Sequence, residues 1–525
     1  MIKKYLMTVA AVLCCAMSMT VFTACSSDDD DDDKNTAPDN QTTTEQADYA
    51  ILFYGFGGDN LDMGIFANMM DFYKGKEESY KNVKIACQYK YSSAEKMQNN
   101  WIKYVMEDEG ENPESIAQAK LIKDMDLQTV RFIVDKNAKE PANEVLLNQQ
   151  NIYGEKNCHV SNVDSLTNFI NWASKACPAK HYILIVSDHG GGYQPHGDLT
   201  FEAPAKTRGV VFDTGNQPIV SFSASALKHA IGRANAHMDV VYFDACLMNT
   251  IEYQFELKDL TDYFILSSFV VPGAGGSYSV LIDELAKNTT DIETALKNFN
   301  KASVDRWDRD AANNYAQGDE DSKWDYHDMT VTRAKSLNAF GVKFKEFVDK
   351  LVVAYADEEN KAKVDSITKY AFKVNNARPG YDMVDYAQGI VDALPNVYDD
   401  QFDYELGTLF NNCLVSQYCS KFLMDQNLSV DCSIMLGVEG SYYMYNYDRD
   451  DPKILHGYTI YHADGTMEKY TTGVAEPEFS TWPSTLEDTY EQLAFDKATG
   501  WSRWLKLNKQ VPCYNSLVEM HYPIE

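Results

Sequence analysis

The sequence predicts an α/β fold whose first half forms a mostly parallel β-sheet flanked by helices. Short apolar runs of the kind that form buried strands recur through this half. They occupy residues 49–54, 83–87, 132–134, 182–186 and 240–243. Residues 166–173 and 227–234, which lie between such runs, carry apolar side chains at helical spacing. Alternating strands and helices favour parallel pairing, because each crossover helix covers a face of the sheet. We assign this domain to residues 48–290.

The composition is that of a folded protein that does not bind nucleic acid. The 525 residues are 45% hydrophobic and 12% aromatic, which is enough apolar material for a sizeable core. Lys and Arg number 47 and Asp and Glu number 78, so the net charge is −31. Nucleic-acid binders need basic residues that neutralise phosphates, so we expect no such partner. Beyond the N-terminus no apolar run reaches about 18 residues, and no internal membrane helix is expected.

The first 24 residues have the form of a bacterial export signal. Lys3 and Lys4 precede an apolar stretch over residues 5–22. The residues around Ala24 and Cys25 resemble a lipoprotein processing site, and this resemblance implies cleavage before Cys25 and lipidation of its thiol, with palmitate among the acyl chains. Such chains hold a protein at a membrane, here the outer membrane or the cell surface. An ordinary signal peptide, with Cys25 incidental, is the alternative.

Residues 25–47 form an acidic tether in this interpretation. Six consecutive aspartates at 28–33 repel one another, and almost nothing apolar is present to collapse. The acidic stretch also resembles surface-export signals of some diderm bacteria, and a plain spacer is the alternative. The run lacks the glycine turn and the spaced ligands of a calcium loop.

Neither the cysteines nor the glycines indicate a metal or nucleotide site. After Cys25 the chain has eight cysteines and no CxxC pair, which argues against zinc ribbons and thioredoxin-like motifs. A glycine-rich segment at 55–58 follows the first strand, but Asn60 stands where a dinucleotide loop needs its third glycine. We therefore expect no metal ligands and no required cofactor.

Two strand ends carry side chains that are suited to nucleophilic catalysis. His189 follows the strand at 182–187, and Cys246 follows the strand at 240–243. Ligands of parallel sheets bind beyond the carboxyl ends of the strands, so these two side chains can meet. An imidazole can accept the proton of a nucleophilic thiol and return it. The glycines at 190–192 allow backbone N–H groups to approach a developing oxyanion closely. Taken alone the pair is a weak signal, because a buried cysteine and a histidine in a turn are both common.

The surrounding segments, 182–192 and 240–252, resemble the clostripain family of cysteine peptidases. The resemblance continues through residues 55–62, 267–278 and 490–505. It implies a caspase-like fold in which His189 is the general base or proton donor and Cys246 is the nucleophile. The backbone N–H groups of Gly190 and Cys246 are then the oxyanion donors. Protein or peptide substrates are implied as partners.

The same resemblance indicates a preference for cleavage after Arg or Lys. Asp244 matches the carboxylate that the family places in its pocket for a basic side chain, as a hydrogen-bonded ion pair. A helix N-terminal charge is the alternative reading of Asp244. The sequence departs from the family pattern where Phe269, Val270 and Val271 replace polar and acidic residues, and where Gly276 replaces a tryptophan. These changes predict a less acidic, more apolar pocket.

Self-processing is a further hypothesis from the resemblance. Family members are often activated by cleavage after a basic residue in the region that follows the histidine. Lys206 and Arg208 lie in a proline-containing segment there, and such exposed segments are easily cut. A plain surface loop is the alternative. Calcium activates some members, and a role for it stays open here although no ligand set can be named.

Residues 291–525 are predicted to form a supporting, largely helical α+β region. An apolar face runs through Leu337, Phe340, Phe344, Val348 and Leu351. The tyrosine-rich run at 442–447 is predicted as a strand, with a glycan- or peptide-binding loop as the alternative. The favoured function is a cell-envelope cysteine endopeptidase. The alternatives are a catalytically silent relative, or a surface lipoprotein that binds glycans or peptides.

Overall fold

The structure is a computed structural model of the whole chain, and it describes thirteen parts of it. These are residues 46–56, 61–91, 95, 129–139, 159–193, 210–213, 220–318, 326–375, 378–436, 441–447, 455–462, 467–471 and 490–508. The predicted export signal, Cys25, the acidic tether up to residue 45, and the processing residues Lys206 and Arg208 lie outside the described residues. Within them, no helix combines the length and apolar character needed to cross a bilayer.

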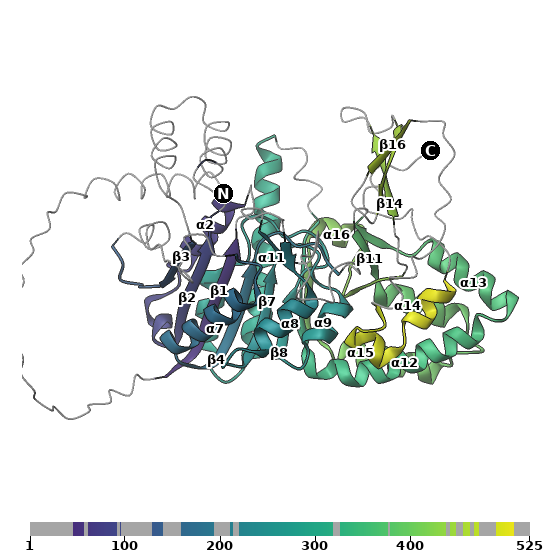
Figure 1. Cartoon of the computed structure of the whole chain (residues 1–525), viewed down its shortest axis with the longest axis horizontal. Helices are drawn as coiled ribbons and strands as arrows, with labels where there is room; N and C mark the ends of the chain where they lie inside the picture. The colour runs from purple at the N-terminus through teal and green to yellow at the C-terminus, as the bar shows by residue number, and fades with distance from the viewer. Residues whose placement is uncertain are drawn as a thin grey trace, which may run out of the picture.

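An eight-stranded sheet with the order β12-β9-β8-β7-β4-β1-β2-β3 is the centre of the molecule (Figure 1). Its strands are β1 (Ala47–Phe56), β2 (Val83–Lys90), β3 (Thr129–Ile133), β4 (Ala179–Ser187), β7 (Met238–Asp244), β8 (Thr261–Leu266), β9 (Asp328–Arg333) and β12 (Leu414–Cys419). The pairs β2-β1, β1-β4, β4-β7 and β7-β8 are parallel, whereas β3, β9 and β12 pair antiparallel at the two sides. The predicted mostly parallel sheet is confirmed, with antiparallel strands at its edges.

Both faces of the sheet are buried, because successive side chains of its strands enter two different cores. On β7, Val240 and Tyr242 enter one core while Val241 and Phe243 enter the other. Such strands read as continuous apolar runs, which is why they could be found in the sequence.

In the described part of the chain, three helices lie over each face of the parallel part. The first set is α7 (Val163–Ala176), α8 (Ala224–Gly232) and α9 (Ile251–Leu257). The second set is α2 (Asp62–Asp71), α10 (Tyr278–Lys287) and α11 (Ile292–Ala316). Side chains that the sequence analysis placed on one helical face, such as Leu166 and Phe169, are fully buried against the sheet. Asn162 and Ser223 cap α7 and α8 with side-chain oxygens that accept backbone N–H groups. The caspase-like layering of helix, sheet and helix is therefore present.

A largely helical region follows and packs beside β8 and β9. It contains α12 (Leu337–Ala354), α13 (Glu358–Lys369), α14 (Met383–Ala393), α15 (Asp400–Asn411), α16 (Lys421–Asp425), α18 (Ala494–Thr499) and α19 (Ser502–Leu507). In Figure 1 the yellow C-terminal helices lie among α12, α14 and α15. The predicted apolar face of α12 is buried along its length, and Trp501 and Trp504 are fully buried beside it.

Smaller elements complete the description. The described residues include the short 3-10 helices η1 (Glu77–Lys81) and η4 (Ala334–Ser336). The remaining strands are β5 (Val210–Asp213), β6 (Val220–Phe222), β10 (Lys373–Asn375), β11 (Arg378–Asp382), β13 (Ser433–Ile434), β14 (Ser441–Tyr447), β15 (Leu455–His462) and β16 (Met467–Thr471). The tyrosine-rich run is β14, so its prediction as a strand is confirmed.

Candidate active site

The carboxyl ends of β4 and β7 bring the two predicted reactive residues to one edge of the sheet. Ser187 and Asp244 are the last paired residues of these parallel strands. His189 and Cys246 each lie two residues further along, and both are half-buried. The parallel pairing therefore brings the two segments that carry His189 and Cys246 to the same edge of the sheet.

Gly190 shows how closely the two strand ends approach. A Cβ atom added to Gly190 would lie 2.0 Å from the carbonyl oxygen of Cys246 and 2.8 Å from its backbone nitrogen. Both atoms belong to the backbone, so no side chain could rotate away. Only glycine fits this position, for reasons of space rather than of backbone conformation.

Cys246 also differs from the other described cysteines in its exposure. Cys87, Cys177, Cys413, Cys419 and Cys432 are all buried, whereas Cys246 is half-buried. Burial raises the pKa of Cys177 to about 11 and that of Cys413 to about 12, which disfavours their reactive thiolates. Among the cysteines that the structure describes, Cys246 is therefore the one whose surroundings suit a nucleophile.

The turn that follows Cys246 is strained and is held by the segment after β8. Leu247 has a φ of 64°, a left-handed conformation that non-glycine residues adopt at a cost of about 1–2 kcal/mol. Its backbone N–H donates to the carbonyl of Phe269 at 2.8 Å. The N–H of Val271 donates to the Cys246 Sγ at 3.3 Å. The segment 267–271 thus fixes the position of the thiol.

Asp244 lies beneath this edge with its carboxylate turned towards α10 and α11. It is only 5% exposed. The hydroxyl of Tyr242 donates to it at 2.9 Å, the hydroxyl of Tyr278 donates to its other oxygen, and the N–H of Gly276 donates at 3.4 Å. Burial raises the pKa of the Asp244 carboxyl, although these donors and the nearby Arg306 oppose the rise. The chain's own donors therefore already occupy the carboxylate.

The glycine-rich segment after Pro272 forms the cover over Asp244. Gly275 has a φ of 58°, and a Cβ there would lie 2.4 Å from an oxygen of Asp244. The carbonyl of Gly275 accepts from the guanidinium of Arg306 and, at 2.8 Å, from the indole N–H of Trp307. Gly276, the glycine that departs from the family pattern, is also closely packed, because a Cβ there would lie 2.7 Å from the Phe299 ring and 2.8 Å from the Tyr242 hydroxyl.

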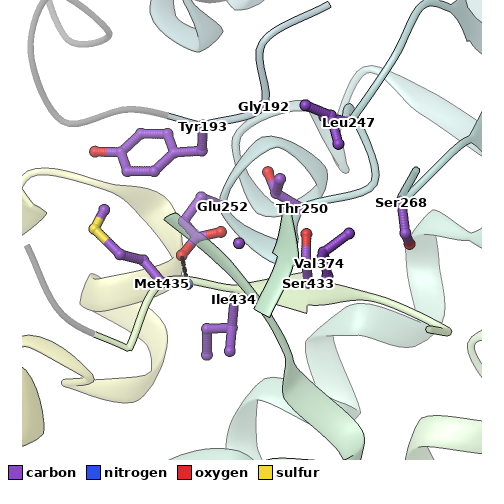
Figure 2. A pocket seen from close by; sticks show the side chains of 11 residues that line it. Gly192, Tyr193, Leu247, Thr250, Glu252, Ser268, Val374, Ser433, Ile434 and Met435 are labelled. Atoms are coloured by element: carbon purple, nitrogen blue, oxygen red, sulfur yellow. Dashed lines mark hydrogen bonds between the residues drawn. The ribbon is translucent and has the colours of Figure 1, made fainter. Parts of the chain in front are cut away.

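A small pocket is lined in part by Leu247, the residue that follows Cys246 (Figure 2). Gly192 and Leu247 line it next to the reactive residues, and Glu252 of α9 lies within it. One oxygen of Glu252 accepts from the N–H of Met435 at 3.0 Å and from the hydroxyl of Tyr490 at 2.8 Å, while its second oxygen has no hydrogen-bond partner among the described residues. Burial raises the pKa of Glu252 to about 7.

The described residues contain no group of three or more His, Cys, Asp or Glu side chains that could hold a metal ion. Three residues of the site were not singled out from the sequence, although they lie within segments that resemble the family. They are Glu252, Tyr242 and Tyr278. Glu252 and Tyr278 act through contacts with residues distant in the chain, Met435 and Asp244, which leave no local signal, whereas Tyr242 contacts Asp244 two residues further along the same strand.

Comparisons with known proteins identify the family and agree with the fold. The model of the clostripain family matches residues 95–506. Clostripain of Hathewaya histolytica is 24% identical over 227 residues, which are 38% of this chain and 40% of clostripain, so the match spans less than half the length of that relative.

Two solved structures from Bacteroides thetaiotaomicron share the fold. One is a secreted C11 cysteine protease in complex with an irreversible peptide inhibitor, with a TM-score of 0.50 and 15% identity over 87% of this chain and 99% of that one. The other is the secreted C11 cysteine protease named iotapain, with a TM-score of 0.51 and 15% identity over 86% of this chain and 99% of that one. At these identities the similarity supports the caspase-like architecture.

Proposed function

The chain belongs to the clostripain family of cysteine peptidases, and from this premise we propose that it hydrolyses peptide bonds with Cys246 as the nucleophile and His189 as the general base. The observation that carries the proposal is the register of β4 and β7, with Gly190 packed on the backbone of Cys246. A positioned imidazole contributes on the order of 10²–10⁴ in rate.

The proposed reaction has two halves. The Cys246 Sγ attacks the scissile carbonyl carbon while its proton passes to His189, and the carbonyl oxygen becomes an oxyanion. The N–H groups of Gly190 and Cys246 donate to this oxyanion, and one such donor contributes about 3–4 kcal/mol. The C–N bond then breaks, and His189 protonates the leaving amine. Water, deprotonated by His189, attacks the thioester and releases the acid and the thiol.

We propose that cleavage follows Arg or Lys, with Asp244 as the group that attracts the basic side chain. Its position two residues before Cys246 supports this role. Because two tyrosine hydroxyls hold the carboxylate, a basic group gains access by replacing its longest hydrogen bond, the one from Gly276 at 3.4 Å. Val270 of the segment 267–271 is 37% exposed. This exposed apolar side chain supports an additional tolerance for apolar residues beside the basic residue of the substrate.

Further proposals concern location, processing and cofactors. We propose export and lipid anchoring at Cys25 on the outer membrane or cell surface; the two structural relatives described above are secreted proteases, which is consistent with export. We propose self-cleavage after Lys206 or Arg208. We further propose that the reaction requires no cofactor.

A mixed peptide library tests the proposed activity. The purified mature protein is incubated with the library, and the cleavage sites are read by mass spectrometry. We expect cleavage after Arg and Lys that disappears in Cys246→Ala and His189→Ala and persists in Cys177→Ala, which changes a buried thiol elsewhere. Cleavage that survives Cys246→Ala contradicts the proposal. An intact library with a folded wild type favours the binding-lipoprotein alternative. Mass spectrometry of the intact protein shows whether residues 206–208 are cut.

A further inference from the structure

Asp328, the first residue of β9, is fully buried against the segment that follows β8. Its Oδ1 accepts from the Ser267 hydroxyl at 2.7 Å and from the Phe269 N–H at 2.9 Å. Its Oδ2 accepts from the Ser268 N–H at 3.2 Å. One carboxylate therefore binds three consecutive residues.

These bonds replace the strand ladder at the point where it stops. The last pair of β8 and β9 joins Leu266 to Thr330. Beyond Leu266 the backbone N–H groups of Ser268 and Phe269 find no strand partner, and buried N–H groups without an acceptor cost about 1–3 kcal/mol each. The Asp328 carboxylate supplies the missing acceptors, so the segment leaves the sheet along a fixed path.

The same segment controls the surroundings of the Cys246 thiol. The carbonyl of Phe269 accepts the N–H of Leu247, and the carbonyl of Ser267 accepts the N–H of Asn249 at 2.9 Å. The N–H of Val271 contacts the Sγ of Cys246. Because Leu247 is held in a left-handed conformation, the turn depends on contacts from outside for its shape.

We propose that Asp328 is a positioning residue for the nucleophile: it fixes the segment 267–271, which in turn holds the Cys246 turn and directs the Val271 N–H at the thiol. This inference rests on the proposed role of Cys246. The carboxylate of Asp328 binds residues 267–269 and not Cys246, so it acts on the thiol through two hydrogen-bonded steps. Displacement of reacting atoms by about 1 Å costs on the order of 10²-fold in rate, so a small shift of this segment has a large effect.

Asp328→Asn tests the inference, because it turns the acceptor of the Ser268 N–H into a donor. Asp496→Asn is the matched control: Asp496 is also buried, and it accepts from the N–H and the hydroxyl of Ser502 in the C-terminal helices, away from the site. Three quantities are measured on the full chain: the kcat and KM for a basic peptide, the rate at which iodoacetamide modifies Cys246, and the melting temperature. The alkylation rate is read by mass spectrometry on the peptide that contains Cys246.

We expect Asp328→Asn to lower kcat about 10- to 100-fold with KM within about twofold, and to slow alkylation of Cys246 on the order of tenfold. Asp496→Asn is expected to lower the melting temperature and leave both rates unchanged. If Asp328→Asn does not fold, Ser267→Ala removes one donor, leaves the carboxylate in place and is expected to change both rates in the same direction.

A folded Asp328→Asn protein with wild-type kcat and alkylation rates overturns the inference, and so does a Ser267→Ala protein with both rates unchanged. The proposed function fails separately, through activity that survives Cys246→Ala. The alkylation rate requires no turnover, so the two failures are distinguishable.

Discussion

Gly190→Ala is expected to abolish most activity with little change in the fold. The added methyl group would lie 2.0 Å from the Cys246 carbonyl oxygen, 2.8 Å from its nitrogen and 2.9 Å from its carbonyl carbon. Ordinary contacts begin at about 3.4 Å, so the ends of β4 and β7 must separate by more than 1 Å. Such a separation carries His189 away from the thiol and displaces the proposed oxyanion donors. We expect kcat/KM to fall at least 10²-fold, which equals about 2.7 kcal/mol of transition-state stabilisation.

Gly273→Ala provides the matched control in the same site. A Cβ at Gly273 meets no atom within 4 Å, and its segment covers Asp244. We expect its kcat/KM to stay within about twofold of wild type. Initial rates with a basic peptide substrate give kcat/KM, and thermal unfolding gives the stability of each variant. Overpacking costs about 1–3 kcal/mol, so the Gly190→Ala protein still folds below its lowered melting temperature. Wild-type kcat/KM for folded Gly190→Ala would show that the two strand ends do not meet as described.

Three other predictions concern stability and specificity. Burial raises the pKa of Glu252 to about 7, of Asp328 to about 6 and of Asp382 to about 7, so the folded state binds more protons than the unfolded state and stability falls as pH rises from about 4 to 7. We expect the melting temperature to rise as pH drops from 8 to 5. Glu252→Gln is expected to flatten this slope, because it removes a pH-dependent contribution to the free energy of unfolding on the order of 3 kcal/mol. A slope unchanged by Glu252→Gln contradicts the reasoning. Tyr278→Phe removes a hydrogen-bond donor from the buried Asp244 carboxylate. We expect the free energy of unfolding to fall by about 1–3 kcal/mol and the kcat/KM preference for Arg over Leu to weaken. Tyr404→Phe is the control, because Tyr404 is 70% exposed, and we expect it to change neither quantity. Trp501→Ala removes a fully buried side chain whose indole N–H donates to the carbonyl of Met435. We expect denaturant unfolding to show that the free energy of unfolding falls by about 3–5 kcal/mol. Val342 is 74% exposed, and we expect Val342→Ala to change this free energy by less than about 0.5 kcal/mol.

The sequence predicted the features that depend on local pattern. Strands buried on both faces are visible as apolar runs, and parallel strands end at one edge, so the segments that carry His189 and Cys246 could be assigned to one edge of the sheet before any coordinates. The edge strands β9 and β12 were not identified, because both come from beyond residue 290 and join the sheet through long-range pairing. Contacts between such distant segments leave no periodicity in the chain.

The state of Asp244 was also beyond the reach of the sequence. Its spacing from Cys246 indicated a carboxylate near the site, but the tyrosine hydroxyls that occupy it come from β7 and α10. Side chains alternate along β7, so Tyr242 shares a face with Asp244, and this contact follows from the strand period. The contact with Tyr278 depends on how α10 packs, which a single sequence does not specify.

The direction of β9 explains how four neighbouring strands contribute to one site. In the order β9-β8-β7-β4, the last three strands run parallel and present their carboxyl ends at the edge where the segment 267–271, Cys246 and His189 lie. Because β9 is antiparallel to β8, its first residue and not its last reaches that edge, and this residue is Asp328. A parallel β9 would present Arg333 there, whose guanidinium has no acceptor for backbone N–H groups. The antiparallel direction of β9 therefore places the Asp328 carboxylate next to the segment 267–271, which contacts the Cys246 turn.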